Sequence, residues 1–162
     1  MLGLDSLKRF GLAQTTQRLA PDTLGLVRRS WRVAGKSKAG RWLFMRALLR
    51  KIPYSGTLMP SIERLGGGVC VLHLEDRSRY RNHLGSIHAV ALANLLELAA
   101  NLALVSELPD GAEFIVTSLN IDYLKKARGS LRAEGRVERL PRINHATTMR
   151  SEAFCTDAAG DT

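Results

Sequence analysis

The chain has 162 residues, of which 45% are hydrophobic and 24% are charged, and its formal net charge is +9. This length and composition are typical of one soluble globular domain with a sizeable core. Two cysteines are too few for a disulfide framework, and we expect neither a signal peptide nor a transmembrane helix. We therefore expect a cytoplasmic protein in which Cys70 and Cys155 are reduced, with no metal and no other cofactor.

The positive charge is concentrated in the N-terminal part of the chain. Residues 1–65 contain thirteen Lys and Arg against three acidic residues, whereas the remainder contains eleven against twelve. Any electrostatic partner of the whole protein is therefore expected at the N-terminal end.

Two short helices are predicted at the start of the chain, over residues 4–20 and 22–34, because Pro21 and Asp22 form a typical start for the second. A basic loop follows at residues 35–40. It contains Gly-Lys-Ser, but it lacks the earlier glycine of a phosphate-binding loop and follows no strand, so we reject that chemistry.

A third helix is predicted over residues 41–52, ended by Pro53. Apolar side chains cluster on one face of it (Phe44, Met45, Leu48, Leu49 and Ile52), and basic side chains lie opposite (Arg46, Arg50 and Lys51). This pattern predicts a helix that packs on a domain through its apolar face.

We interpret residues 1–52 as a basic helical extension packed on a domain of residues 53–162, with the basic face in solvent. The alternative is attachment to a membrane surface, for which a basic amphipathic helix with Trp42 nearby is suitable. Nucleic-acid binding is disfavoured because no recognition motif accompanies the charge.

A strand is predicted over residues 69–76, after a glycine-rich connector at 60–68. The stretch 82–105 then begins as a polar turn with a glycine and continues as about five turns of almost wholly apolar helix. A helix that is apolar on nearly every side belongs in the interior of a fold.

One acidic residue, Glu97, lies in the middle of this apolar helix, and Asn94 and Asn101 share a narrow face with it. A carboxylate in such a place is costly unless it is paired, hydrogen-bonded or exposed at a site. Glu97 is therefore the leading functional candidate. A structural ion pair, for example with Arg79, is the alternative.

Three strand-like segments follow, over residues 114–123, 131–140 and 146–156. The middle one alternates strictly between apolar and charged residues, which indicates an antiparallel sheet with one wet face. A turn-like segment at 157–161 comes where another strand would begin, so the last strand of the sheet is expected to be missing or trimmed. The order of elements predicts an α+β domain in which an antiparallel sheet wraps one apolar helix.

The residues at the start of the long helix resemble a motif of the hotdog-fold thioesterase superfamily. That motif consists of Asn82, Gly85, His88 and Ala89, followed on the same helix by Glu97. Residues 120–123 (Asn-Ile-Asp-Tyr) and 128–129 (Arg-Gly) are similar to the strand and turn after that helix. The resemblance covers about residues 60–160. It is closest to a branch of poorly characterised bacterial thioesterase-like proteins.

The resemblance implies a hotdog homodimer, or a dimer of dimers, that hydrolyses an acyl thioester, usually of coenzyme A, at the interface between protomers. Glu97 would act as general base or nucleophile, and Asn82 and His88 would hold water or the thioester carbonyl. The backbone N–H of Ala89 would contact the oxyanion. Further substrate-binding candidates are Gly85, Asn94, Asn101, Thr117, Ser118, Lys125, Lys126 and Arg128, of which the last three are candidates for the phosphates of coenzyme A.

Helical geometry favours a site shared between two chains. Nine residues rotate by about 900° in an α-helix, so His88 and Glu97 face roughly opposite ways. Two helices packed antiparallel could instead bring Glu97 of one chain to His88 of the other. The rival hypothesis is a non-catalytic hotdog protein that binds an acyl chain or acyl thioester as a sensor, scaffold or carrier. A hotdog dehydratase is disfavoured because the chain has no clear Asp/His pairing.

Overall fold

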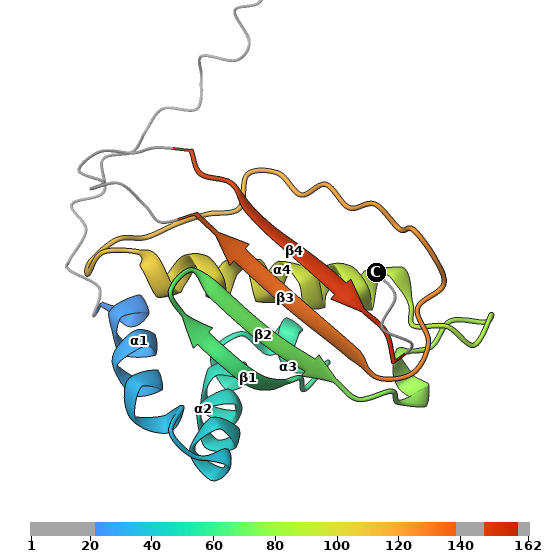
Figure 1. Cartoon of the computed structure of the whole chain (residues 1–162), viewed down its shortest axis with the longest axis horizontal. Coiled ribbons are helices and arrows are strands. Elements are labelled where there is room, and N and C mark those ends of the chain that lie inside the picture. Colours follow the sequence, from blue (N-terminus) through green and yellow to red (C-terminus); the bar gives the residue numbers. More distant parts are fainter. Residues whose placement is uncertain (1–21, 139–147, 159–162) are drawn as a thin grey trace, which may run out of the picture.

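The computed structural model describes residues 22–138 and 148–158. The elements follow one another as shown in Figure 1, namely α1 (Thr23–Ala34), α2 (Lys38–Lys51), α3 (Pro53–Gly56), β1 (Ser61–Gly66), β2 (Val69–Leu74), the 3-10 turn η2 (Ser78–Tyr80), α4 (Ala89–Glu107), β3 (Leu131–Val137) and β4 (Ser151–Thr156). The predicted helix over residues 4–20 and most of the predicted final turn lie outside the described residues.

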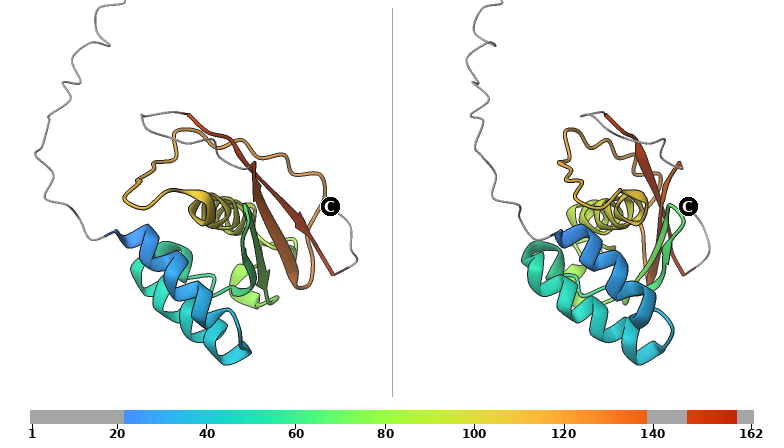
Figure 2. Two further views of the ribbon diagram at one scale, coloured as in Figure 1. Left: turned by 60° about the vertical axis from the view of Figure 1, so that its left-hand side comes forward. Right: turned by 90° about the vertical axis from the view of Figure 1, so that its left-hand side faces the viewer.

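The four strands form one antiparallel sheet in the order β1-β2-β3-β4, and α4 lies across one face of it (Figures 1 and 2). The alternation along β3 places Leu131, Ala133 and Gly135 against the helix, while Arg132 and Glu134 face away. This arrangement confirms the predicted α+β domain, with a sheet packed on one long buried helix.

A tight hairpin joins β1 to β2. Gly67 and Gly68 form its two-residue turn with φ of +62° and +73°, a conformation that side-chain-bearing residues rarely adopt. The prediction of a connector over residues 60–68 is therefore wrong. A Gly-Gly pair between two apolar segments is itself a hairpin signal, which that prediction overlooked.

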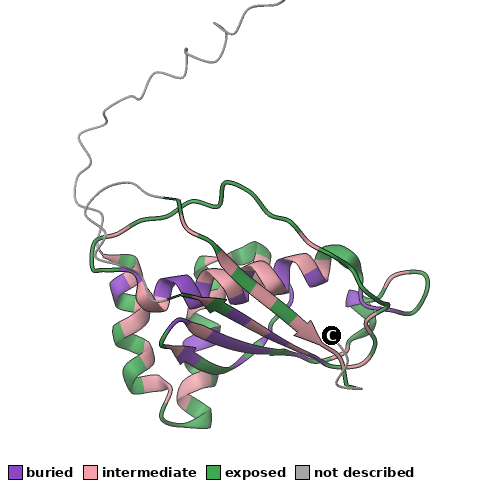
Figure 3. Ribbon diagram, turned by 45° about the horizontal axis from the view of Figure 1, so that its top comes forward, coloured by how far each residue is buried: buried purple, intermediate pink, exposed green. Residues whose placement is uncertain are grey.

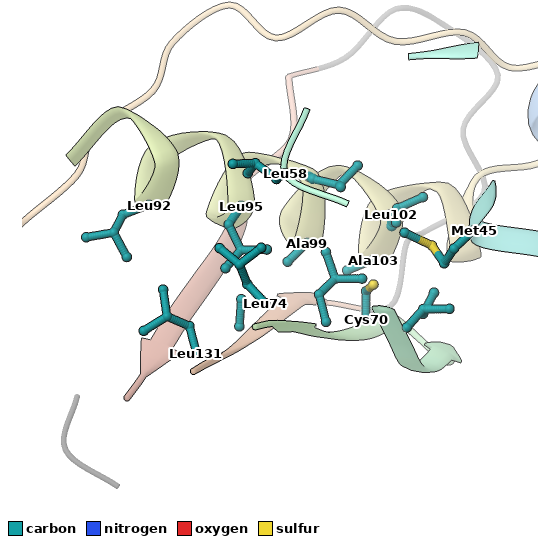
Figure 4. Close-up of a cluster of buried hydrophobic side chains, with 14 of the residues drawn as sticks. Met45, Leu58, Cys70, Leu74, Leu92, Leu95, Ala99, Leu102, Ala103 and Leu131 are labelled. Atoms are coloured by element: carbon teal, nitrogen blue, oxygen red, sulfur yellow. The ribbon is translucent and has the colours of Figure 1, made fainter. Parts of the chain in front are cut away.

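The hydrophobic core lies between α4 and the sheet (Figure 4). Its largest fully buried side chains are Leu72, Leu74, Leu95, Leu131 and Cys70. Burial of each leucine contributes about 1.5–3 kcal/mol. Among the described helices, α4 alone is long and apolar enough to cross a membrane by length and composition. However, 56% of its apolar 18-residue window is buried inside the fold, as in the core helix of a globular domain.

Helix and sheet backbones approach each other closely at Gly135. A Cβ added there would overlap the carbonyl of Ala99 and lie 2.6 Å from the backbone nitrogen of Ala100. Only glycine fits between β3 and α4 at this position, so the contact sets the spacing of α4 above the sheet.

The helices α1 and α2 form an antiparallel pair beside the sheet (Figure 2). The side chains of Asp22 and Ser37 cap the two N-termini by accepting hydrogen bonds from Gly25 and Gly40. Phe44 and Met45 of α2 enter the core shared with α4 and the sheet. Leu48, Leu49 and Ile52 of this region also pack against the core, whereas Arg46, Arg50 and Lys51 are exposed.

The segment 114–123, predicted as a strand, belongs to no strand of the sheet. It runs extended and exposed beside β4 (Figures 1 and 3), and it makes no backbone hydrogen bond with another described strand. The strand prediction over 114–123 is therefore wrong. Strand propensity of its side chains does not supply a pairing partner.

Candidate functional site

A short polar loop leads into α4 and is organised by one side chain. Asn82 Oδ1 accepts hydrogen bonds from the backbone N–H groups of Leu84 and Ser86, at 2.9 and 3.2 Å, and from the Ser86 hydroxyl. Gly85 in the same loop has a φ of +71°. The amide oxygen of Asn82 therefore shapes the loop, and only its Nδ2 is left to donate to another molecule.

His88 is the N-cap of α4. Its Nδ1 accepts a hydrogen bond of 3.1 Å from the backbone N–H of Val90, so the neutral ring carries its proton on Nε2. Two further N–H groups of the first turn, those of Ala91 and Leu92, donate to the His88 carbonyl. The side chain is exposed, so Nε2–H is available as a donor.

The backbone N–H of Ala89 has no acceptor in the described part of the chain. It is an exposed donor at the positive end of a helix of 19 residues. Such a group can stabilise negative charge that develops on a carbonyl oxygen.

A cavity of about 570 Å³ lies on the other side of α4, between that helix, the segment 114–122 and β4. Glu97 and Asn101 line it from the helix, one turn apart, and Thr117 and Ser118 line it from the segment. The structure thus brings four of the predicted site residues to one cavity. Leu96, Leu104 and Phe154 add apolar wall, which suits an acyl chain beside a polar group.

Glu97 is half-buried and faces this cavity, and its one hydrogen-bond partner among the described residues is the Asn101 side-chain amide at 3.5 Å. Within the described residues no Lys or Arg lies at ion-pair distance from it. Arg79, the partner of the structural alternative, instead lies over the Tyr80 ring and donates to its hydroxyl. The carboxylate is therefore not held in an ion pair within these parts of the chain.

The two groups of candidates do not meet within one chain. Nine residues separate His88 from Glu97, which corresponds to about 13 Å along a helix and to opposite sides of it. None of Asn82, His88 and Ala89 lines the Glu97 cavity.

Asn94 has a structural environment, although it was a substrate-binding candidate. Its side chain is 6% exposed, and its Oδ1 accepts a hydrogen bond of 2.8 Å from the Ser55 hydroxyl of α3. It does not line the cavity that contains Glu97.

The three basic candidates lie on the segment that leads to β3. Lys125 forms a 3.1 Å ion pair with Asp157 and lines a smaller cavity of about 120 Å³. Lys126 and Arg128 are exposed and line neither cavity.

Six polar residues that line the larger cavity were not among the site candidates, namely Asn120, Asp122, Thr148, Arg150, Ser151 and Glu152. Asn120 and Asp122 line it from the extended segment. The resemblance to the hotdog superfamily relates residues 120–123 only to the strand and turn after the long helix. Their polar side chains alternate with Leu119, Ile121 and Tyr123, and this alternation is the signal that could have identified a polar wall.

Among the described residues no group of three or more His, Cys, Asp or Glu side chains could hold a metal ion. Two carboxylates of this cavity, those of Glu97 and Asp122, have no ion-pair partner in the described part of the chain, and the free donors at the start of α4 include backbone and imidazole N–H groups.

An antiparallel sheet packed around one long buried helix is the arrangement of the hotdog fold, and solved structures show the same fold. A hypothetical thioesterase protein from Streptococcus pneumoniae, solved with coenzyme A, has a TM-score of 0.58 and 19% identity over 70% of this chain and 87% of its own. A protein from S. sahachiroi named AziG has a TM-score of 0.57 and 23% identity over 67% of this chain and 86% of its own.

A further crystal structure, from a genomics project, has a TM-score of 0.61 and 22% identity over 82% of this chain and 99% of its own. No curated protein matches the chain significantly. The chain belongs to the family described as "Domain of unknown function (DUF4442)", whose model matches residues 40–162.

Proposed function

We propose that the protein is an acyl-thioester hydrolase, with an acyl-coenzyme A as its substrate class. The observation that carries the proposal is the Glu97 carboxylate, which faces a partly apolar cavity from an apolar helix and has no ion-pair partner among the described residues. Placing a carboxylate on an apolar helix costs free energy, and a carboxylate without a described ion-pair partner is suited to base catalysis. The fold is also that of a hypothetical thioesterase protein solved with coenzyme A.

In the proposed reaction Glu97 takes a proton from a water molecule whose oxygen attacks the thioester carbonyl carbon. The Ala89 N–H and the dipole of α4 stabilise the resulting oxyanion, and Nε2–H of His88 donates to the same carbonyl region. The carbon–sulfur bond then breaks, and the thiolate leaves and takes up the proton. Direct attack by the Glu97 carboxylate, with an anhydride that water then hydrolyses, is the nucleophilic variant.

The proposal requires a homodimer. Because Glu97 and the start of α4 are on opposite sides of the helix, each active site takes Glu97 from one protomer and the loop around His88 from its partner. We place this dimer in the cytoplasm.

Hydrolysis of a panel of acyl-coenzyme A substrates by the wild type and by Glu97→Gln tests the assignment. Loss of the base is expected to lower kcat/KM by about 100-fold or more, with substrate binding retained. Glu107→Gln is the matched control, because it makes the same change on the same helix at a residue that does not line the cavity. Equal activity of Glu97→Gln and wild type would refute the assignment.

Mixing two inactive variants tests the shared site. In a heterodimer of Glu97→Gln and His88→Ala, one site carries both changes and the other carries neither. Random exchange of subunits is then expected to restore about a quarter of the wild-type activity. Sites contained within single chains would give no recovery. A purely monomeric protein in a solution mass measurement would also exclude the shared site.

A non-catalytic role in binding acyl thioesters is the second candidate. It is favoured by one observation, since the oxygen of Asn82 accepts hydrogen bonds from its own loop and is therefore not free to accept one from an attacking water molecule. Tight binding of acyl-coenzyme A by the wild type with no turnover of any substrate would establish this role instead.

A further inference from the structure

The helix pair α1–α2 carries most of the positive charge of the described chain. Residues 22–58 contain nine Lys and Arg and one acidic residue, Asp22. Arg28 and Arg29 pair with acids. Arg41 donates to the backbone carbonyl of Glu63. The other six basic side chains of the pair have no acid at ion-pair distance in the described part of the chain, and these are Arg32, Lys36, Lys38, Arg46, Arg50 and Lys51. The proposed hydrolysis uses none of them.

The outward face of α2 combines this charge with large apolar side chains. Trp42 and Leu43 are 62% and 61% exposed, although Phe44 and Met45 next to them lie in the core. Trp42, Leu43, Arg46 and Arg50 fall within an arc of about 100° on the helix, so they form one surface. We call these four residues the outer α2 face.

The members of the outer α2 face also contact one another. The Arg46 guanidinium lies over the Trp42 ring, 5.2 Å from its centroid. The cation is thus held beside the indole, with both groups at the surface. No described acidic residue neutralises this face.

We propose that the outer α2 face docks the protein on an anionic lipid surface. A tryptophan and a leucine that project between arginines match the region where the lipid head groups meet the acyl chains. There an indole is favoured and basic side chains meet the phosphates. Each basic residue near an anionic bilayer favours binding, and the six unpaired ones supply attraction before any apolar side chain inserts.

The composition of the outer α2 face argues against two other binding partners, a second copy of the chain and a nucleic acid. A second copy of the chain would bring two strongly basic faces together, which is unfavourable. A nucleic acid would satisfy the charge but not the exposed Leu43, and no groove-reading motif accompanies the helix. The inference does not depend on the proposed hydrolysis, and an inactive protein would dock equally well.

Sedimentation with vesicles tests the proposal on the full chain. Vesicles of phosphatidylcholine alone are compared with vesicles in which about a quarter of the lipid is phosphatidylglycerol, at low and high salt. We expect binding to the anionic vesicles that weakens with salt, and no more than trace binding to the neutral ones. Arg46→Glu/Arg50→Glu should weaken it by at least about tenfold.

The control is Arg64→Glu/Arg77→Glu, which makes the same change in net charge at exposed residues outside the helix pair. If the control weakens binding as much as Arg46→Glu/Arg50→Glu, overall charge rather than this face is responsible, and the proposal is wrong. Equal binding to neutral vesicles, no binding at all, or binding only to an oligonucleotide would also overturn it.

The two tryptophans provide a second readout. Trp31 packs against Phe44 with ring centroids 5.2 Å apart, whereas Trp42 is exposed. Lipids with brominated acyl chains should therefore quench the fluorescence of the vesicle-bound wild type, and Trp42→Phe should remove the quenched component. Quenching that survives in Trp42→Phe would show that another surface faces the bilayer.

Discussion

The hydroxyl of Tyr123 donates a hydrogen bond of 3.1 Å to the backbone carbonyl of Ala89. It connects the extended segment that walls the Glu97 cavity to the first turn of α4, where the proposed oxyanion donor lies. The extended segment is thus tied to the start of α4 within one chain, although Glu97 and the Ala89 N–H belong to different proposed sites.

Removing that hydroxyl is expected to have a small but specific effect. Tyr123→Phe deletes one hydrogen bond at a half-exposed position, which should lower the free energy of unfolding by about 0.5–1.5 kcal/mol. Urea denaturation measures it. Tyr54→Phe is the control, because Tyr54 is exposed and its hydroxyl has no described partner. A larger loss in Tyr54→Phe than in Tyr123→Phe would contradict the assignment.

Adding a methyl group at Gly135 is expected to destabilise the fold far more than Tyr123→Phe does. Because a Cβ there would overlap the Ala99 carbonyl in the backbone of α4, either the helix or β3 must move. We expect Gly135→Ala to lower the free energy of unfolding by about 3 kcal/mol or more. The control is Gly67→Ala, because a Cβ at this position has no atom within 4 Å. Its positive φ alone should lower the free energy of unfolding by about 1 kcal/mol. Equal melting temperatures of the two variants would refute the close contact.

The stability of the sheet should depend on Glu134 at acid pH. Arg136 and Arg132 donate hydrogen bonds to this carboxylate, at 2.7 and 2.8 Å, and lower its pKa from the ordinary value near 4.5. A carboxyl with a lowered pKa in the folded state stabilises the fold above its ordinary pKa. That contribution is lost as the pH falls through the lower folded value.

Glu134→Gln should therefore be less stable than the wild type near neutral pH, by up to about 1 kcal/mol for this partly exposed pair. The gap should close below about pH 4. Urea titrations across this range check it, with Glu152→Gln on β4 as the control. If the difference in stability between the wild type and Glu134→Gln instead grows at acid pH, the predicted direction of the pH dependence is wrong.

The two thiols should be slow to react in the folded protein. Burial raises the pKa of Cys70 far above its usual range, and burial together with nearby Asp157 raises that of Cys155 to about 11. Because the thiolate is the reactive form, labelling by iodoacetamide at pH 8 should be slow for both and slower for Cys70. Unfolding in urea should remove the difference, and fast labelling of Cys70 in the folded state would show that the strand is not packed.

The buried helix and the strands with strong patterns were predictable from local sequence. A run of apolar residues after a polar turn identified α4, and strict alternation identified β3, because both patterns report burial directly. The strand β1 was missed because its glycine-rich end was interpreted as a connector and not as a hairpin.

The prediction of a strand over residues 114–123 was the opposite error, because it added a strand that the sheet does not contain. It shows the limit of local sequence information. Its side chains suit a strand, but a strand also needs a neighbouring edge, and neighbours are set by the whole fold. For the same reason the sequence placed Asn94 beside Glu97 on one helical face but could not show that Ser55 covers it. The clustering of Thr117 and Ser118 with Glu97 also needed the path of the extended segment.

The free edge of β4 has a consequence for the behaviour of the protein in solution. In the described part of the chain this strand is paired on one side only, and Phe154 on it is 47% exposed. An open strand edge with an exposed aromatic side chain is a template for pairing between molecules. The charged side chains of Arg150 and Glu152 at the start of the strand oppose such growth. Self-association should therefore begin at this edge, and neutralising those two charges should lower the concentration at which the protein aggregates.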